Sequence, residues 1–198
     1  MDEPAVSGIS GVPWDAVELP SQFLENWCWE TEALNQISGH YETGERLPSA
    51  LLERMRGARN FQSAMQMLRQ IEFSVFDMAL HEGSPSTSVE ELQARIDAVR
   101  KEVAVLIPPA FNRFQNSFSH IFAGGYAAGY YSYKWAEVLS ADAFSRFEEA
   151  GIFDEQSGRD FVRLVLESGG VNEPLENFVA FRGRPPEIDA LLRHSGLA

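Results

Sequence analysis

FQSAMQMLRQIEFSVFDMA, residues 61–79, is the stretch that decides the fold class. Its apolar side chains recur at every third or fourth position for about five turns, the spacing of one face of an α-helix. These positions are Phe61, Ala64, Met65, Leu68, Ile71, Val75, Met78 and Ala79. No strand-like alternation of apolar and polar residues continues for more than a few positions anywhere in the chain. We therefore predict an all-α, multi-helix fold in which this stripe faces a core.

The segment on the N-terminal side of this stretch also has apolar residues at helical spacing. Residues 15–37 carry apolar side chains at mostly helical spacing, and Pro20 falls in the first turns, where its missing N–H costs little. Residues 1–13 are rich in glycine and serine and are predicted to be loop. Residues 39–48 are predicted to connect the first helix to a short one around residues 51–55.

On the C-terminal side, Ser88 and Glu91 form the pattern of a capping box, which predicts that a helix begins there. The two prolines at positions 108 and 109 end it. The rest of the chain is predicted as a loop over residues 111–125 and helices over residues 126–149, 158–167, 174–181 and 186–194.

The composition is typical of a packed, acidic globular protein. The chain has 198 residues, of which 44% are hydrophobic, and a formal net charge of −13. A domain of this length buries roughly 70% of its unfolded surface, so we predict that residues 1–198 form a single helical domain. The negative charge repels phosphate backbones and anionic lipid headgroups, so we expect no nucleic acid and no membrane as partners.

The single cysteine points to a reducing compartment. Cys28 is alone and cannot form an intrachain disulfide. The chain also lacks a signal-peptide pattern and an apolar run of the ~20 residues that a membrane span requires. We therefore predict a cytoplasmic protein. Because Cys28 lies between two tryptophans on a predicted helix, we expect it to be a small core residue.

SHIFAGGYAAGYYSY, residues 119–133, gathers one histidine and four tyrosines around a glycine pair. Neutral O–H and N–H donors stabilise an oxyanion without adding a competing charge, which makes such a cluster suited to amide hydrolysis. Tyr126, Tyr130 and Tyr133 would share one face if a helix had begun by Tyr126, whereas Tyr131 would point elsewhere. The alternative is an aromatic stripe packed into a core.

The glycine pair favours the interpretation as a functional loop. Adjacent glycines lose much conformational entropy on folding. Gly124 and Gly125 are therefore tolerated best where a loop must move or approach a ligand closely. His120, six residues before Tyr126, could donate a hydrogen bond to a substrate backbone or to an oxyanion. Its alternative is an ordinary surface or core histidine.

VELPSQ, residues 17–22, places Glu18 in an early helical turn, with Gln22 and Glu25 on the same face. From the residues alone, Glu18 is a solvated acid favoured by the helix dipole, and the other two belong to the polar side of an amphipathic helix.

Taken together, these segments resemble the M3 family of zinc oligopeptidases, of the oligopeptidase A type. The resemblance extends through VSGISG at residues 6–11, VELPSQ, the tyrosine-rich loop and RGR at residues 182–184. It implies the C-terminal part of a zincin-type (gluzincin) catalytic domain. It also implies cytoplasmic metalloendopeptidase activity on short peptides and a single zinc ion.

The same resemblance implies roles for individual residues. Glu18 would be the third zinc ligand, and Gln22 and Glu25 would orient the ligands. The residues that would close over the substrate and stabilise its oxyanion are His120, Tyr126, Tyr130 and Tyr133, with Gly124 and Gly125 in the substrate loop.

The His-Glu-x-x-His motif that supplies the other two zinc ligands is missing from this chain. His40, His81 and His194 show no paired spacing, and we assign them no role. One carboxylate does not hold a catalytic zinc, so we predict that the isolated chain is inactive and does not bind zinc stably. Its expected partners are short peptides and either the missing upstream segment or another copy of itself through exposed apolar surface.

The alternative is a non-catalytic helical module, derived from such a peptidase, that binds peptides or complements the missing segment. The turn at residues 182–186, Arg-Gly-Arg-Pro-Pro, is interpreted as a solvated basic loop.

Overall fold

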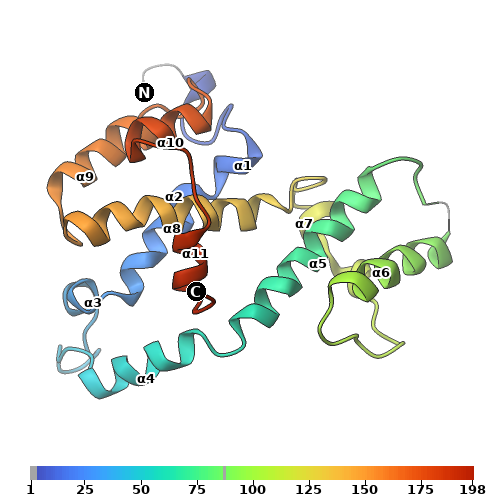
Figure 1. The fold of residues 1–198 in the computed structure, drawn as a ribbon, viewed down its shortest axis with the longest axis horizontal. Helices are drawn as coiled ribbons and strands as arrows, with labels where there is room; N and C mark the ends of the chain where they lie inside the picture. The colour runs from blue at the N-terminus through green and yellow to red at the C-terminus, as the bar shows by residue number, and fades with distance from the viewer. Residues whose placement is uncertain (1–3, 87) are drawn as a thin grey trace. The chain divides into compact units, whose positions relative to one another are not determined.

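The structure is a computed structural model that describes residues 4–86 and 88–198 (Figure 1). Within these residues the regular elements are helices and no strand occurs, so the all-α prediction is confirmed. No helix among them has the length and hydropathy needed to cross a membrane. Two compact units are present, one formed by Met1–Phe61 with Trp135–Ala198 and the other by Gln62–Lys134. The prediction of a single domain stays a prediction.

The first unit contains most of the short helices. Its N-terminal part holds η1 (Pro4–Val6), α1 (Trp14–Val17), α2 (Leu19–Glu25), η2 (Asn26–Trp29), α3 (Thr31–Ile37) and α4 (Ser49–Arg59). Its C-terminal part holds most of α8 (Ser132–Ala150), then α9 (Glu155–Phe161), the π-helical η4 (Val162–Leu166), α10 (Pro174–Arg182) and α11 (Asp189–His194).

The predicted helix over residues 15–37 is broken at two places. Pro20 cannot donate a backbone hydrogen bond, so α1 ends and α2 begins around Glu18, with the proline in the new first turn. The second break is at Glu30, whose extended backbone (φ −91°, ψ 128°) separates η2 from α3. The connection predicted over residues 39–48 is confirmed.

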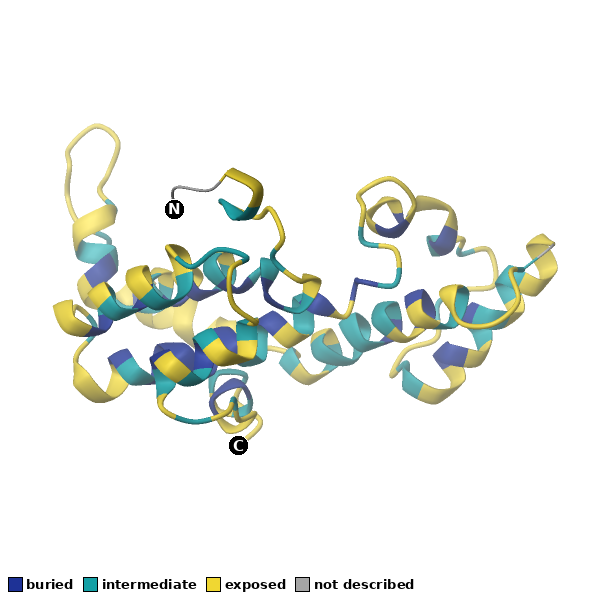
Figure 2. Cartoon of the chain, turned by 90° about the horizontal axis from the view of Figure 1, so that it is seen from above, coloured by how far each residue is buried: buried dark blue, intermediate teal, exposed yellow. Residues whose placement is uncertain are grey.

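The core of the first unit is built from phenylalanine rings. Phe23 of α2 stacks on Phe161 of α9 at a centroid distance of 3.9 Å. Trp27 contacts Phe144 and Phe147 of α8 edge-on at 4.7 and 4.9 Å. Aromatic pairs of this kind add stability beyond the apolar area they bury. They fix the N-terminal helices against α8, with buried and exposed positions alternating along the helices (Figure 2).

The prediction that Cys28 is a core residue is wrong. In the tight turn of η2 its neighbour Trp27 faces the core and donates from Nε1 to the backbone oxygen of Ile152 at 2.9 Å. Cys28 is left exposed, because residues next to each other in a helical turn point in different directions.

The second unit is organised around α5 (Ser63–His81), which packs along α6 (Val89–Val103) (Figure 1). Both helices were predicted, and the cap is confirmed because Ser88 Oγ accepts a hydrogen bond from the backbone N–H of Glu91 at 3.1 Å. The predicted loop over residues 111–125 instead holds two short helices, η3 (Phe114–Ser117) and α7 (Ser119–Phe122).

The prediction that the apolar stripe of α5 faces a core is wrong. None of the eight stripe residues is buried, and Val75 and Met78 are 37% and 41% exposed. The buried apolar residue of this helix is Phe76, which lies outside the stripe. Two acids, Glu72 and Asp77, lie instead at 1% and 0% exposure on the inner side of the helix. Buried acids require donors, so α5 carries polar connections as well as apolar packing.

Candidate functional site

The second unit brings four of the predicted site residues together. The ring of His120 lies 6.1 Å from that of Tyr126, 5.6 Å from Tyr130 and 6.0 Å from Tyr133, measured between centroids. Tyr126 stacks on Tyr133 at 5.0 Å, and Tyr130 lies 5.2 Å from Tyr133. We call these four residues the ring cluster.

A turn, and not a helix, assembles the ring cluster. The prediction that a helix begins near Tyr126 is wrong, because α8 begins at Ser132. The chain before it turns tightly: the backbone N–H of Gly129 donates to the oxygen of Tyr126 at 2.8 Å, and Ala128 has a left-handed φ of 55°. We call residues 125–131 the tyrosine turn. The fold of this turn brings the four rings together, which the shared face of a helix was expected to do.

The local geometry requires both glycines, Gly124 just ahead of the turn and Gly125 at its start. A Cβ at Gly124 would lie 2.9 Å from the backbone oxygen of His120, closer than side chains are found. Gly125 has a φ of 84°, which glycine adopts without strain. The glycine pair therefore allows the chain to fold back on His120, whose oxygen accepts from the backbone N–H of Tyr126 at 3.0 Å.

The members of the ring cluster differ in exposure. His120 is exposed and Tyr126 and Tyr133 are half-buried, whereas Tyr130 is only 8% exposed. The hydroxyl of Tyr130 donates to Oε1 of Gln70 on α5 at 2.9 Å. Burial raises the pKa of Tyr130 above its ordinary value, so its hydroxyl stays a hydrogen-bond donor to a higher pH than that of an exposed tyrosine.

Asp77 of α5 is a residue of this site that sequence reasoning missed. Its carboxylate accepts the backbone N–H groups of Ala128 and Tyr130, at 3.0 and 2.9 Å. His81, to which no role was assigned, lies against the same carboxylate, 3.0 Å from Nδ1 to Oδ1. The only signal in the sequence is an acid in the middle of an apolar helix, which does not indicate its partner.

Glu18 belongs to the first unit, at the junction of α1 and α2. Its side chain is half-buried, and Ser21 donates from Oγ both to Oε2 of Glu18, at 3.1 Å, and to its backbone oxygen, at 3.0 Å. The N–H of Gln22 donates to the same backbone oxygen at 3.1 Å, so helical spacing is kept across the break. Gln22 is half-buried and Glu25 is exposed.

The predicted site residues thus fall into two sets, the ring cluster in one unit and Glu18, Gln22 and Glu25 in the other. Among residues 4–86 and 88–198, no group of three or more His, Cys, Asp or Glu side chains is arranged to hold a metal ion. The carboxylate of Glu18 fits the role of one zinc ligand, since Ser21 already orients it, and it would be one of the three that a catalytic zinc takes from a protein.

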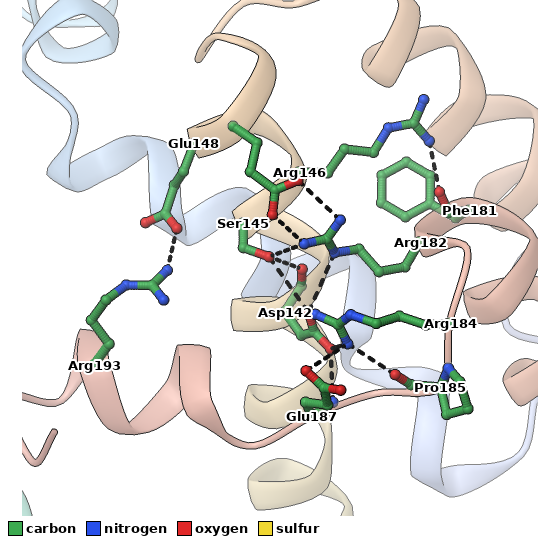
Figure 3. A network of polar contacts seen from close by, with 11 residues as sticks. Asp142, Ser145, Arg146, Glu148, Phe181, Arg182, Arg184, Pro185, Glu187 and Arg193 are labelled. Atoms are coloured by element: carbon green, nitrogen blue, oxygen red, sulfur yellow. Dashed lines mark hydrogen bonds and ion pairs between the residues drawn. The ribbon is translucent and has the colours of Figure 1, made fainter.

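The arginines at the C-terminal turn are not a solvated loop. Arg184 makes two parallel hydrogen bonds to the buried carboxylate of Asp142, at 2.6 and 2.7 Å, and the backbone N–H of Glu187 donates to it at 2.7 Å (Figure 3). Arg182 also lies against it, with Nε 3.4 Å from Oδ1. Gly183 has the left-handed φ of 83° that ends α10 and lets both arginines reach the same acid.

The described residues form a helical fold that carries an ordered cluster of one histidine and three tyrosines beside a turn. The model of peptidase family M3 matches residues 2–197, and the chain belongs to this family. It is 59% identical to oligopeptidase A of Salmonella typhimurium and of Escherichia coli, each over 193 residues, and 49% identical over 200 residues to a probable cytosolic oligopeptidase A of Arabidopsis thaliana. The alignments cover 97–99% of this chain but 28% of each relative, so the chain spans little more than a quarter of their length.

Proposed function

We propose that this chain supplies the C-terminal part of the active site of a zinc metalloendopeptidase that hydrolyses short peptides. The observation that carries the proposal is the ring cluster, in which a histidine and three tyrosines converge on one turn. Membership of peptidase family M3 and 59% identity to oligopeptidase A support it.

The ring cluster would act on the oxygen of the scissile amide. As an amide is attacked, negative charge develops on that oxygen, and fixed O–H and N–H donors stabilise it. His120 is exposed and Tyr126 and Tyr133 are half-buried, so each reaches the surface in part. The hydroxyl of Tyr130 must first release Gln70 before it can donate elsewhere. Removing one such donor typically costs about 3 kcal/mol of barrier.

Glu18 would be the metal ligand of this chain. Zinc, when bound by three protein ligands, lowers the pKa of a bound water to near neutrality. Ser21 donates a hydrogen bond to the Glu18 carboxylate, and Gln22 and Glu25 would orient the remaining ligands. The other two ligands and the general base would come from a segment that carries His-Glu-x-x-His.

The isolated chain would therefore be inactive. It has four histidines in total and no His-Glu-x-x-His, so zinc would find one carboxylate where it needs about three ligands. The proposed partners are short peptides and the segment that completes the site, with self-association as a further mode. No nucleic acid and no membrane is expected as a partner of a chain with a net charge of −13.

A second function is favoured by the same cluster. The ring contacts among His120 and the three tyrosines are made by this chain's own residues, so the chain would hold a peptide backbone even without turnover. It would then be a non-catalytic peptide-binding module.

We propose a cytoplasmic location. The lone Cys28 is exposed, and a free exposed thiol is suited to a reducing compartment. One of the relatives is named as a probable cytosolic oligopeptidase A.

A quenched fluorescent peptide separates the two functions. The chain is assayed with stoichiometric zinc, first alone and then with a separately expressed N-terminal segment of Escherichia coli oligopeptidase A that carries His-Glu-x-x-His. We expect no cleavage by the chain alone and cleavage by the mixture. Peptide binding without turnover in either case would favour the binding module, and cleavage by the chain alone would refute the proposed dependence on a second segment.

A further inference from the structure

Asp77 is a buried acid in the middle of α5, and its exposed fraction is 0%. A carboxylate taken out of water must find hydrogen-bond donors, because an unpaired one is very costly. Oδ1 of Asp77 accepts the backbone N–H of Ala128 at 3.0 Å, and Oδ2 accepts that of Tyr130 at 2.9 Å. Each carboxylate oxygen thus holds one amide of the tyrosine turn.

The tyrosine turn needs contacts from other parts of the chain to keep its backbone conformation. Ala128 adopts a left-handed backbone with φ 55°, which is unfavourable for a residue with a Cβ and persists only where the surroundings impose it. Ala128 and Tyr130 precede α8, which begins at Ser132, so their backbone N–H groups need acceptors outside that helix. Asp77 supplies acceptors at this point, and so defines where the turn sits.

Both the backbone N–H and the side-chain hydroxyl of Tyr130 are hydrogen-bonded to side chains of α5. Its backbone N–H donates to Asp77, and its hydroxyl donates to Oε1 of Gln70, which precedes Asp77 by two helical turns on the same face. A side chain fixed at both ends cannot shift without breaking one of these bonds. Tyr133 and His120, whose rings lie 5.2 and 5.6 Å from that of Tyr130, are positioned by it in turn.

His81 orients the carboxylate from the outer side. Its Nδ1 lies 2.8 Å from the backbone oxygen of Asp77 and 3.0 Å from Oδ1 of the same residue. Both of these atoms can only accept, so Nδ1 must carry a hydrogen and donate. His81 therefore restrains the carboxylate in the position in which it meets the turn.

We propose that Asp77 is the positioning residue of the tyrosine turn and that His81 fixes its carboxylate. Asp77 does not touch a substrate; it acts through the amides of Ala128 and Tyr130. That the positioned rings hold a peptide backbone rests on the proposed function above, whereas the hold of Asp77 on the turn stands independently.

The test uses the 198-residue chain and three variants. Asp77→Asn keeps the shape but presents an NH₂ group to one of the two turn amides. The matched control is Glu72→Gln, a second buried acid on α5, which accepts from Arg69 and Arg100 at 3.0 and 3.1 Å and makes no bond to the turn. His81→Gln, at a side chain 33% exposed, is the milder variant.

The first readout is amide hydrogen exchange at Ala128 and Tyr130, measured by NMR. We expect Asp77→Asn to accelerate exchange at these amides by about tenfold or more, the usual consequence of losing a hydrogen bond to a charged acceptor, and His81→Gln to accelerate it less. Glu72→Gln should leave exchange at both amides unchanged relative to the rest of the unit. Equal protection in Asp77→Asn and the wild type, or equal loss in Glu72→Gln, would overturn the proposal. If Asp77→Asn does not fold, unchanged protection in His81→Gln overturns it instead.

The second readout is the affinity for a blocked, fluorescently labelled oligopeptide. We expect about tenfold weaker binding for Asp77→Asn and unchanged binding for Glu72→Gln, because only the former displaces the rings. If the wild type binds no peptide, the second function, that of a peptide-binding module, fails, while the exchange rates still decide whether Asp77 positions the turn.

Discussion

Burying a carboxylate without donors costs several kcal/mol, and Asp142 lies on α8 with an exposed fraction of 0%. Arg184 contributes two parallel hydrogen bonds to it, and the backbone N–H of Glu187 contributes a third. These donors follow Asp142 by more than forty positions in the chain. The single acid therefore fixes the turn after α10 to α8 within the first unit.

We expect Arg184→Leu to destabilise the first unit by about 3 kcal/mol, because it leaves a buried charge without its principal partner. The measurement is the free energy of urea unfolding, followed by circular dichroism. The control is Arg159→Leu, which removes an exposed ion pair with Glu155 and should cost less than about 1 kcal/mol. Equal costs for the two variants would show that the Asp142 pair is no stronger than a surface pair.

The pH dependence of stability follows from the same carboxylate. Burial alone would raise the pKa of Asp142, but the hydrogen bonds and charge of Arg184, with the N–H of Glu187 and the charge of Arg182, outweigh it and hold the pKa below its ordinary value. A carboxylate whose native pKa is depressed contributes stability that is present above its unfolded value of about 3.9 and is lost as the pH falls through the native value. Unfolding free energies measured from pH 7 down to pH 3 should therefore fall less steeply for Asp142→Asn than for the wild type; parallel curves would contradict this.

At the scale of the elements, the segment between α7 and α8 depends on two glycines and one acid. Gly124 brings the chain within close reach of the backbone of His120, Gly125 takes a φ of 84°, and Asp77 holds the following amides. The ring cluster is thus a property of the turn and of α5 together.

We expect Gly124→Ala to disrupt the ring cluster, since the added Cβ would lie 2.9 Å from the oxygen of His120. The near-ultraviolet circular dichroism of the tyrosines should weaken, and the variant should be less stable. Gly57→Ala is the matched control, because a Cβ there meets no atom within 4 Å and lies inside α4, where alanine is favoured by up to about 1 kcal/mol. Tyrosine signals that survive in Gly124→Ala would show that the close approach is not needed.

The elements that were predictable from the sequence are those set by local rules. α5 followed from its apolar spacing and the start of α6 from the cap formed by Ser88. The tyrosine turn was not predictable, because its shape depends on Asp77, about fifty positions earlier. The ion pairs of Asp142 depend equally on distant arginines, and the residues around Arg184 alone resemble any solvated basic turn.

The sequence indicated the residues of the ring cluster but not how they meet. His120, Tyr126, Tyr130 and Tyr133 do converge, although the helical face expected to unite them is absent. The supporting contacts of Gln70 and Asp77 depend on tertiary packing, which local spacing does not encode.

At the scale of the whole chain, much apolar surface stays uncovered. Large apolar side chains at 60% exposure or more include Ile9, Leu24, Ile37, Tyr41, Phe61, Val89, Leu106, Ile107, Phe111 and Val171. Such surface promotes association. We expect the apparent mass in light scattering to rise with concentration; a monomer over the whole concentration range would contradict this.

The central claim is that Glu18 is the zinc ligand this chain contributes to a peptidase site completed by a second segment. The most direct test mixes the chain with the His-Glu-x-x-His segment of Escherichia coli oligopeptidase A and measures bound zinc and peptide turnover for Glu18→Gln beside Glu32→Gln, an exposed acid of α3 to which no role is assigned. We predict that the wild-type mixture binds about one zinc and cleaves peptide, that Glu18→Gln loses both, and that Glu32→Gln retains most of each. Full zinc binding and turnover by the Glu18→Gln mixture would contradict the account.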